Sequence, residues 1–224
     1  MNNEKLDIKF DNDWTEEELQ KRKNNWKHVQ TIPVGVEFKA EHRVLNLDEV
    51  KKHLEKAKKI AVLDCECRTK RKQCDAPLDV CLFLNEQAEV ALTSEDMQDS
   101  NPREVSFNEA VEILERSHEA GLVHMALSIQ QVETNTICSC CTCCCVILAA
   151  ILRFGLAPHL LTYEKISFTD NNLCNDCGVC IERCQLGARK LDDGKLKVND
   201  EYCYGCGLCV TVCPTQAITL KDKQ

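Results

Sequence analysis

The segments CNDCGVCIERCQ (residues 174–185) and CYGCGLCVTVCP (residues 203–214) repeat one cysteine spacing twice near the end of the 224-residue chain. In each segment three cysteines are separated by two residues, and a fourth cysteine follows after three more. Three thiolates at this spacing reach three irons of one cubane, whereas the fourth reaches the neighbouring cluster. The repeat therefore predicts two [4Fe-4S] clusters, and it favours them over the alternative of two structural zinc sites.

The same spacing predicts which cysteines share a cluster. The first cysteine set would hold one cluster and consists of Cys174, Cys177, Cys180 and Cys213. The second cysteine set would hold the other cluster and consists of Cys203, Cys206, Cys209 and Cys184.

Residues 170–222 resemble a bacterial-type 2[4Fe-4S] ferredoxin, and the two quoted segments carry the resemblance. It implies a pseudo-symmetric domain whose halves each contribute a strand, a cluster loop and a short helix. The residues agree, because short apolar or alternating runs at 165–168 and 217–220 predict strands and Asp193-Gly194 predicts a two-residue hairpin turn. Gln185 departs from the pattern, since proline follows the corresponding cysteine of the second half. We expect a more polar surround for one cluster and no lost ligand.

Ten further cysteines precede this segment in two groups. The first group, CECRTKRKQCDAPLDVC, contains Cys65, Cys67, Cys74 and Cys81. The second group, CSCCTCCC, contains Cys138, Cys140, Cys141, Cys143, Cys144 and Cys145. Thiolates select zinc, copper(I) or iron–sulfur clusters, so these groups predict at least one additional metal centre. The adjacent ferredoxin-type segment favours iron–sulfur, with zinc as the alternative.

The elements that flank the two groups indicate how the groups meet. An apolar strand at 60–63 leads into the first group, and an apolar helix at 146–154 follows the second. Strand and helix ends commonly meet at one edge of an α/β layer, so we expect one shared cavity or two adjoining sites. Two independent structural sites are the alternative. We expect His124 to be a hydrogen-bonded turn residue rather than a ligand, and Arg68 and Arg103 to be solvated at the surface.

The remaining sequence predicts an α+β protein with two domains. Thr15 and Glu18 form a capping box that opens a polar helix through about Lys27, and Ser106 and Glu109 cap a helix that runs to Gly121. An amphipathic helix is predicted over 48–59. We assign residues 1–165 to a cysteine-rich domain of mixed α/β structure and residues 166–224 to the ferredoxin-type dicluster domain.

Composition narrows the function. The net charge of −8 disfavours nucleic-acid binding and favours a redox partner protein with a basic docking surface. Residues 1–26 lack the apolar core of a signal peptide, and the longest apolar run, 146–152, is too short to span a bilayer. We therefore expect a cytoplasmic protein in which 18 cysteines bind metal rather than form disulfides.

Two classes of function follow from these features. The first is electron transfer, by a soluble carrier or by an electron-relay subunit of an anaerobic oxidoreductase. This class is also implied by a resemblance of residues 60–222 to multi-cysteine ferredoxin-fused redox proteins of anaerobes. The second is a reductase whose N-terminal cysteine site carries a catalytic metal cluster fed by the ferredoxin domain; a redox- or metal-sensing module is a third possibility. No nucleotide-binding motif is present and no catalytic residue can be named.

Overall fold

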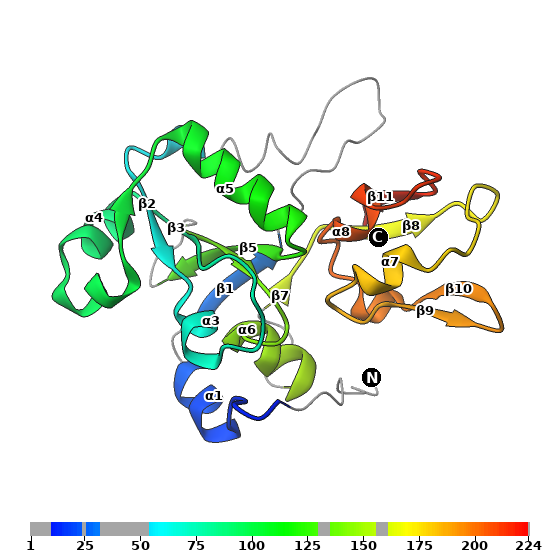
Figure 1. Ribbon diagram of the computed structural model, residues 1–224, viewed down its shortest axis with the longest axis horizontal. Helices are drawn as coiled ribbons and strands as arrows, with labels where there is room; N and C mark the ends of the chain where they lie inside the picture. Colours follow the sequence, from blue (N-terminus) through cyan, green and yellow to red (C-terminus); the bar gives the residue numbers. More distant parts are fainter. Residues whose placement is uncertain (1–9, 24–25, 32–53, 130–134, 156–160, 224) are drawn as a thin grey trace.

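A seven-stranded sheet forms the centre of the larger, N-terminal part of the protein (Figure 1). The computed structural model describes residues 10–23, 26–31, 54–129, 135–155 and 161–223. The strand order is β4-β2-β3-β6-β5-β1-β7. The strands are β1 (Trp26–Thr31), β2 (Ile60–Asp64), β3 (Asp79–Leu84), β4 (Arg103–Glu104), β5 (Val123–Ile129), β6 (Thr136–Cys140) and β7 (Leu161–Thr162). All neighbouring strands are antiparallel except β1 and β7.

Helices cover both faces of this sheet, because the strands bury alternate residues on opposite sides. Ile60 and Val62 of β2 pack with the face of α5 (Phe107–Glu119), whereas Ala61 and Leu63 pack with α4 (Glu86–Thr93). The other helices are α1 (Glu16–Lys23), α3 (Glu66–Arg71), η1 (Glu95–Ser100) and α6 (Val146–Leu148), which continues as the π-helix η2 (Ala149–Arg153). α1, α6 and η2 share a core with Met125 of β5, while its neighbour Ala126 packs under α5.

Two of the predicted helix starts are confirmed. Ser106 Oγ accepts a hydrogen bond from Glu109 N at the start of α5, whose buried face contains Ala110, Ile113 and Leu114. At α1, Thr15 Oγ1 accepts from Glu18 N, and Glu18 Oε2 accepts from Thr15 N at 2.9 Å.

The predicted extent of the first helix is wrong. It ends at Lys23, and residues 26–31 form β1 instead. Asparagines at 24 and 25 are weak helix formers, and pairing with β5 and β7 satisfies the backbone of the strand. Of the helix expected over 48–59, only residues 54–59 are described, and residues 54–56 are helical.

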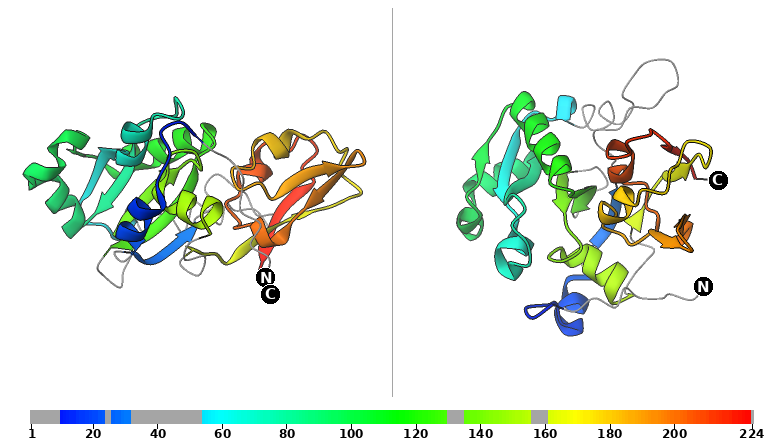
Figure 2. Two further views of the ribbon diagram at one scale, coloured as in Figure 1. Left: turned by 90° about the horizontal axis from the view of Figure 1, so that it is seen from below. Right: turned by 45° about the vertical axis from the view of Figure 1, so that its right-hand side comes forward.

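The C-terminal part contains two small antiparallel sheets around short helices (Figures 1 and 2). β8 (Lys165–Thr169) pairs with β11 (Ile218–Asp222), and β9 (Arg189–Asp192) pairs with β10 (Lys195–Val198). The short helices of this part are α7 (Val179–Glu182), η4 (Asp200–Tyr202) and α8 (Leu208–Thr211). The predicted hairpin turn is confirmed, since Asp193 and Gly194 have φ values of 48° and 73°, as a type I′ turn requires.

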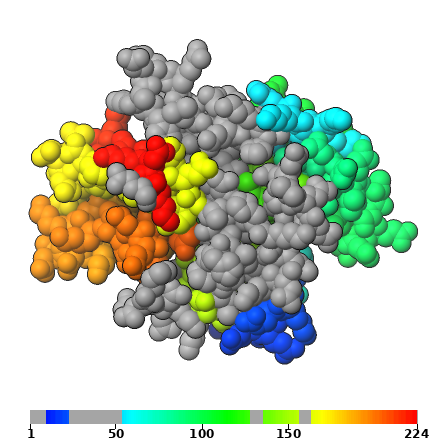
Figure 3. Space-filling model, turned by 180° about the vertical axis from the view of Figure 1, so that it is seen from behind, coloured from blue at the N-terminus to red at the C-terminus, as the bar shows by residue number. Residues whose placement is uncertain are grey.

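The C-terminal part and α4 lie at opposite ends of the molecule (Figure 3). The C-terminal part contacts the end of α5: His118 Nε2 lies 2.9 Å from Thr211 Oγ1, and Arg183 Nη1 donates to Glu119 O at 2.9 Å. β7 is a strand of the large sheet, and β8 is a strand of one of the small sheets. The chain therefore passes from the N-terminal part to the C-terminal part between residues 162 and 165. No helix in the described part of the chain is long and apolar enough to cross a membrane.

Candidate metal centres

The first cysteine set surrounds a small cavity between the loop at 174–178 and the end of α8. Cys174, Cys177, Cys180 and Cys213 all line it. A buried arginine stands behind this set: Arg189 is 3% exposed, and its Nη1 donates to Cys180 Sγ at 3.6 Å. A fixed positive charge at a thiolate offsets the negative charge that an iron–sulfur cluster and its ligands carry.

The second cysteine set surrounds a second small cavity. Its lining includes Cys184, Cys203, Cys206 and Cys209. Ser167 donates its backbone N–H to Cys203 Sγ at 3.3 Å. Gly205 has φ +62°, and a Cβ there would lie 2.0 Å from the carbonyl oxygen of Lys165. The close backbone approach therefore needs glycine.

These surroundings fit two [4Fe-4S] clusters. The structure brings together the four cysteines that the sequence assigns to each set, each around a small cavity. Donors reach the sulfurs of Cys180 and Cys203, as cluster thiolates need. Each bound cluster would supply one-electron chemistry. The residues that line the two cavities hold the thiols in place and shield them from solvent.

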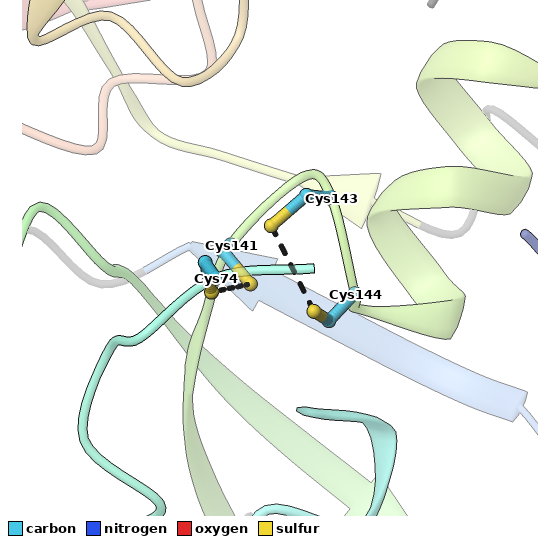
Figure 4. A group of neighbouring side chains, drawn as sticks. All are labelled: Cys74, Cys141, Cys143 and Cys144. Atoms are coloured by element: carbon cyan, nitrogen blue, oxygen red, sulfur yellow. Dashed lines mark hydrogen bonds between the residues drawn. The ribbon is translucent and has the colours of Figure 1, made fainter. Parts of the chain in front are cut away.

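Four of the N-terminal cysteines form a tight cluster, the four-thiol group, shown in Figure 4. It consists of Cys74, Cys141, Cys143 and Cys144, whose sulfurs all lie within 4.8 Å of one another. Two sulfur–sulfur distances are 3.7 Å (Cys74–Cys141) and 3.8 Å (Cys143–Cys144). Cys74 follows α3, and the other three lie between β6 and α6. These four thiols could hold a metal ion.

The other six N-terminal cysteines lie in two buried cores, one of which also contains the four-thiol group, and together they make up the six-thiol ring. It consists of Cys65, Cys67, Cys81, Cys138, Cys140 and Cys145. The neighbouring thiols of Cys67 and Cys81 lower the pKa of the Cys65 thiol. The neighbouring thiols of Cys140 and Cys81 lower the pKa of the Cys138 thiol.

One further contact and one electrostatic interaction connect the remaining members of the ring. A side-chain hydrogen bond joins Cys140 to Cys145, and the charge of Cys145 acts on Cys67. The register of the large sheet explains the ring's central pair, because Cys81 of β3 lies directly opposite Cys138 of β6. The two cysteine groups of the sequence thus meet on one side of the sheet, as expected.

Arg68 lies between the four-thiol group and the six-thiol ring, and its predicted surface position is wrong. It is 1% exposed, and its Nη1 donates to the carbonyl oxygen of Pro77. Its Nη2 lies 3.3 Å from Ser139 O and 3.6 Å from Cys141 Sγ. Burial lowers the pKa of the guanidinium, but the charges of Cys141 and Cys65 outweigh burial and raise it. Arg103 is exposed as predicted and pairs with Glu109.

Residues 12–15 form the N-terminal strap, which holds the loop between β6 and α6 in place. This strap was not predicted from the sequence. Trp14 is 3% exposed and its Nε1 donates to Cys144 O at 2.9 Å. The Arg71 guanidinium lies 3.7 Å from the centre of the Trp14 ring, and Asp13 pairs with the buried Arg153 of η2. The sequence feature that could have indicated the strap is a tryptophan within a polar segment, directly before the capping box of α1.

His124 lies within β5 rather than in a turn, so that expectation is wrong. It is fully buried, and its Nδ1 lies 2.9 Å from Ser139 Oγ on the face opposite Cys138 and Cys140. Its ring stacks with that of His118 at 6.0 Å. Burial lowers the pKa of His124 to about 3, so the imidazole is neutral at pH 7.

The second cysteine set and two of the N-terminal thiols contribute to one buried core. Cys206 belongs to the same buried core as Cys140 and Cys145, and Cys184 packs against that core. Gln185 Oε1 accepts hydrogen bonds from Thr142 Oγ1 at 3.1 Å and from Thr142 N at 3.4 Å. The residue that departs from the ferredoxin pattern thus binds the six-cysteine segment.

Comparison with known families agrees with this geometry at the C-terminus. A family model described as a 4Fe-4S dicluster domain matches residues 167–220. A search of curated proteins found no match to the chain. The match covers both cysteine sets and both small sheets, and it implies iron–sulfur electron transfer. The C-terminal segment of this protein is therefore a ferredoxin-type 4Fe-4S dicluster domain.

Proposed function

We propose that this protein is an electron relay, in which a redox partner exchanges electrons with the dicluster domain and the domain exchanges them with a metal centre held by the N-terminal thiols. One observation carries the proposal: Cys206 of the second cysteine set shares a buried core with Cys140 and Cys145. A soluble carrier that only shuttled electrons between partners would have no use for such a contact.

The contact is dry. Cys206, Cys140 and Cys145 are 8%, 5% and 4% exposed, and Leu208 and Leu186 of the dicluster domain fill the space around them. Apolar packing excludes water from the contact, and the hydrogen bonds of Gln185 to Thr142 fix its register. The thiols of the two regions are thus held at a constant separation, which suits repeated transfer of single electrons.

The first cysteine set supports the other end of the relay. Cys177 is exposed, and the nearby side chains of Leu173 and Val179 are 53% and 42% exposed. Apolar side chains around an exposed thiol suit a transient protein contact. We assign partner docking to this side, and the chain's net charge of −8 favours a partner with a basic surface. An anaerobic oxidoreductase would provide such a partner, and in the reductase alternative the N-terminal centre would pass electrons to a substrate.

Kinetics of reduction would test the relay. Mixing the anaerobic protein with one electron equivalent of a low-potential donor should reduce the dicluster domain first and the N-terminal centre second, as followed by freeze-quench EPR. Leu208→Ala removes packing at the contact and should slow the second phase about tenfold or more. Leu191→Ala is the matched control, because Leu191 is 47% exposed on β9, and it should leave both phases unchanged.

Two results would refute the relay. One is an N-terminal centre whose spectrum never changes on reduction. The other is a second phase of unchanged rate when Cys203→Ser removes a thiol of the second cysteine set.

A further inference from the structure

We infer that the ten N-terminal thiols form two separate metal sites: the four-thiol group binds one tetrahedral ion, and the six-thiol ring binds a polynuclear cluster. Only the choice of metal in the ring rests on the proposed relay. The division itself rests on the sulfur positions: among the described residues, Cys74, Cys141, Cys143 and Cys144 form one group within 4.8 Å, and the other six N-terminal cysteines lie outside it.

Sulfur–sulfur distances identify the ligand of the four-thiol group. A zinc ion bound tetrahedrally by four thiolates at about 2.3 Å requires sulfurs separated by about 3.8 Å. The Cys74–Cys141 and Cys143–Cys144 distances are 3.7 and 3.8 Å, and all four sulfurs lie within 4.8 Å of one another. In a cubane each thiolate binds a different iron, so the sulfurs stand further apart. The spacing therefore suits a single ion, and four thiolates with no open position suit structural zinc.

The six-thiol ring has too many ligands for one ion. A single tetrahedral metal takes four thiolates, yet six thiols remain outside the four-thiol group, and they pack in two cores that share Cys67. Cys81 lies directly opposite Cys138 in the sheet, and Cys138 and Cys140 point to the same face of β6. Six thiolates in one connected ring require at least two metal atoms.

Arg68 separates the two sites electrostatically. Its guanidinium interacts with Cys141 and Cys74 of the four-thiol group and with Cys65 of the six-thiol ring. It also acts on Cys138 across the ring. Both sites are anionic when their thiols are deprotonated, so one buried cation between them reduces their repulsion.

The surroundings of the two sites indicate which metal each site binds. Cys140 and Cys145 of the ring belong to the same buried core as Cys206 of the second cysteine set. A centre in that position serves the relay only if it changes oxidation state, which zinc does not do. Polynuclear iron–sulfur chemistry meets both requirements, whereas no thiol of the four-thiol group belongs to the core that contains Cys206.

Neighbouring cysteines of one segment provide a matched test. Cys143→Ser changes the four-thiol group, and Cys145→Ser, two residues later, changes the six-thiol ring. A second pair, Cys74→Ser and Cys81→Ser, repeats the comparison on the other segment. Zinc and iron per chain would be measured on full-length protein purified without oxygen, alongside EPR and Mössbauer spectra.

The wild-type protein should contain about one zinc and more iron than the eight atoms that two [4Fe-4S] clusters hold. Cys143→Ser and Cys74→Ser should lose the zinc and keep the iron, whereas Cys145→Ser and Cys81→Ser should lose the excess iron and keep the zinc. Loss of both metals in every variant, with the dicluster signals intact, would show one shared site and overturn the division.

The number of zinc and iron atoms per chain distinguishes a failure of this inference from a failure of the proposed relay. Two sites that split as described, with about three zinc ions and eight irons per chain, would keep the division and refute both iron in the ring and the relay. Iron in the ring that is never reduced through the dicluster domain would refute the relay alone. Iron at eight with no zinc would refute both sites.

Discussion

The two halves of this protein arrange their cysteines in opposite ways. In the dicluster domain, each set of four thiols stands around a small cavity. In the N-terminal part, thiols contact one another, with sulfurs as close as 3.7 Å. Three of the four thiols in each dicluster set come from seven consecutive residues, whereas the six-thiol ring depends on the pairing of Cys81 with Cys138 across a sheet. Local spacing therefore defines the first kind of site and tertiary structure the second.

Each half also places a buried arginine at its sulfurs. Arg189 donates to Cys180 Sγ and to Ser167 Oγ in the dicluster domain. Arg68 donates to two backbone carbonyls and approaches Cys141 Sγ in the N-terminal part. The shared device indicates that both halves must compensate buried negative charge.

The largest expected effect of a substitution is confined to the dicluster domain. Gly205→Ala would place a Cβ 2.0 Å from the backbone carbonyl oxygen of Lys165, at φ +62°. A backbone atom cannot yield as a side chain does, so we expect a loss of at least about 3 kcal/mol and failure to assemble the second cluster. Iron content and thermal unfolding of the anaerobic protein measure this.

Gly194→Ala is the matched control for Gly205→Ala. Gly194 has φ +73°, but a Cβ there meets nothing within 4 Å. The variant should cost about 1–2 kcal/mol from backbone strain and keep all its iron. Equal iron loss in both variants would contradict the close-approach argument.

The next prediction compares the two arginines. Arg68→Gln leaves the carbonyl oxygens of Pro77 and Ser139 unpaired and removes the cation between two anionic sites, so we expect a loss of about 3–5 kcal/mol and reduced zinc content. Arg189→Gln should keep the clusters but lower the reduction potential of the first one, since the oxidised form carries less negative charge. Denaturation curves and EPR-monitored potentiometry distinguish these outcomes. An unchanged potential in Arg189→Gln would show that the arginine is only structural.

The third prediction concerns the N-terminal strap, which has no counterpart in the dicluster domain. Trp14→Ala removes a side chain that is 3% exposed and packs in the core with Cys145, so the free energy of unfolding should fall by about 3–5 kcal/mol. Trp14→Phe keeps most of the apolar area and loses the hydrogen bond to Cys144 O, which costs about 1 kcal/mol. Urea unfolding monitored by circular dichroism measures both. Equal losses would mean that the hydrogen bond, not the packing, holds the strap.

Much of the dicluster domain was predictable, because its determinants are local. The cysteine spacing, the Asp193-Gly194 turn and the strands β8 and β11 all follow from short stretches of sequence. In the N-terminal part, the start and buried face of α5 were equally readable from a capping residue and helical periodicity.

The sites that sequence reasoning missed depend on long-range contacts. Nothing near Arg68 reveals that Ser139 and Cys141 will surround it, and a lone arginine is usually solvated. Likewise, the division of the thiols requires the register that places Cys81 opposite Cys138. The contact of Gln185 with Thr142 depends on how the two halves meet, which no local pattern encodes.

The smallest predicted effect lies at the junction between the two halves, where His118 Nε2 meets Thr211 Oγ1. Burial, with the charge of Arg183, lowers the pKa of His118 to about 4. In the unfolded chain the pKa is about 6.5, so the unfolded state binds more protons below that pH. The stabilisation is complete above pH 6.5 and is lost as the pH falls toward 4. Between pH 7.5 and 5.5 the free energy of unfolding should fall by about 1 kcal/mol from this group.

His118→Gln tests this contribution, because glutamine keeps a hydrogen-bond donor for Thr211 Oγ1 but does not titrate. The pH dependence of anaerobic urea unfolding should weaken by about 1 kcal/mol across that interval, while the buried His124 keeps its own share. If the wild-type protein and the variant lose stability in parallel from pH 7.5 to 5.5, His118 is not held neutral at the junction. The contact between the dicluster domain and α5 would then be looser than its buried geometry implies.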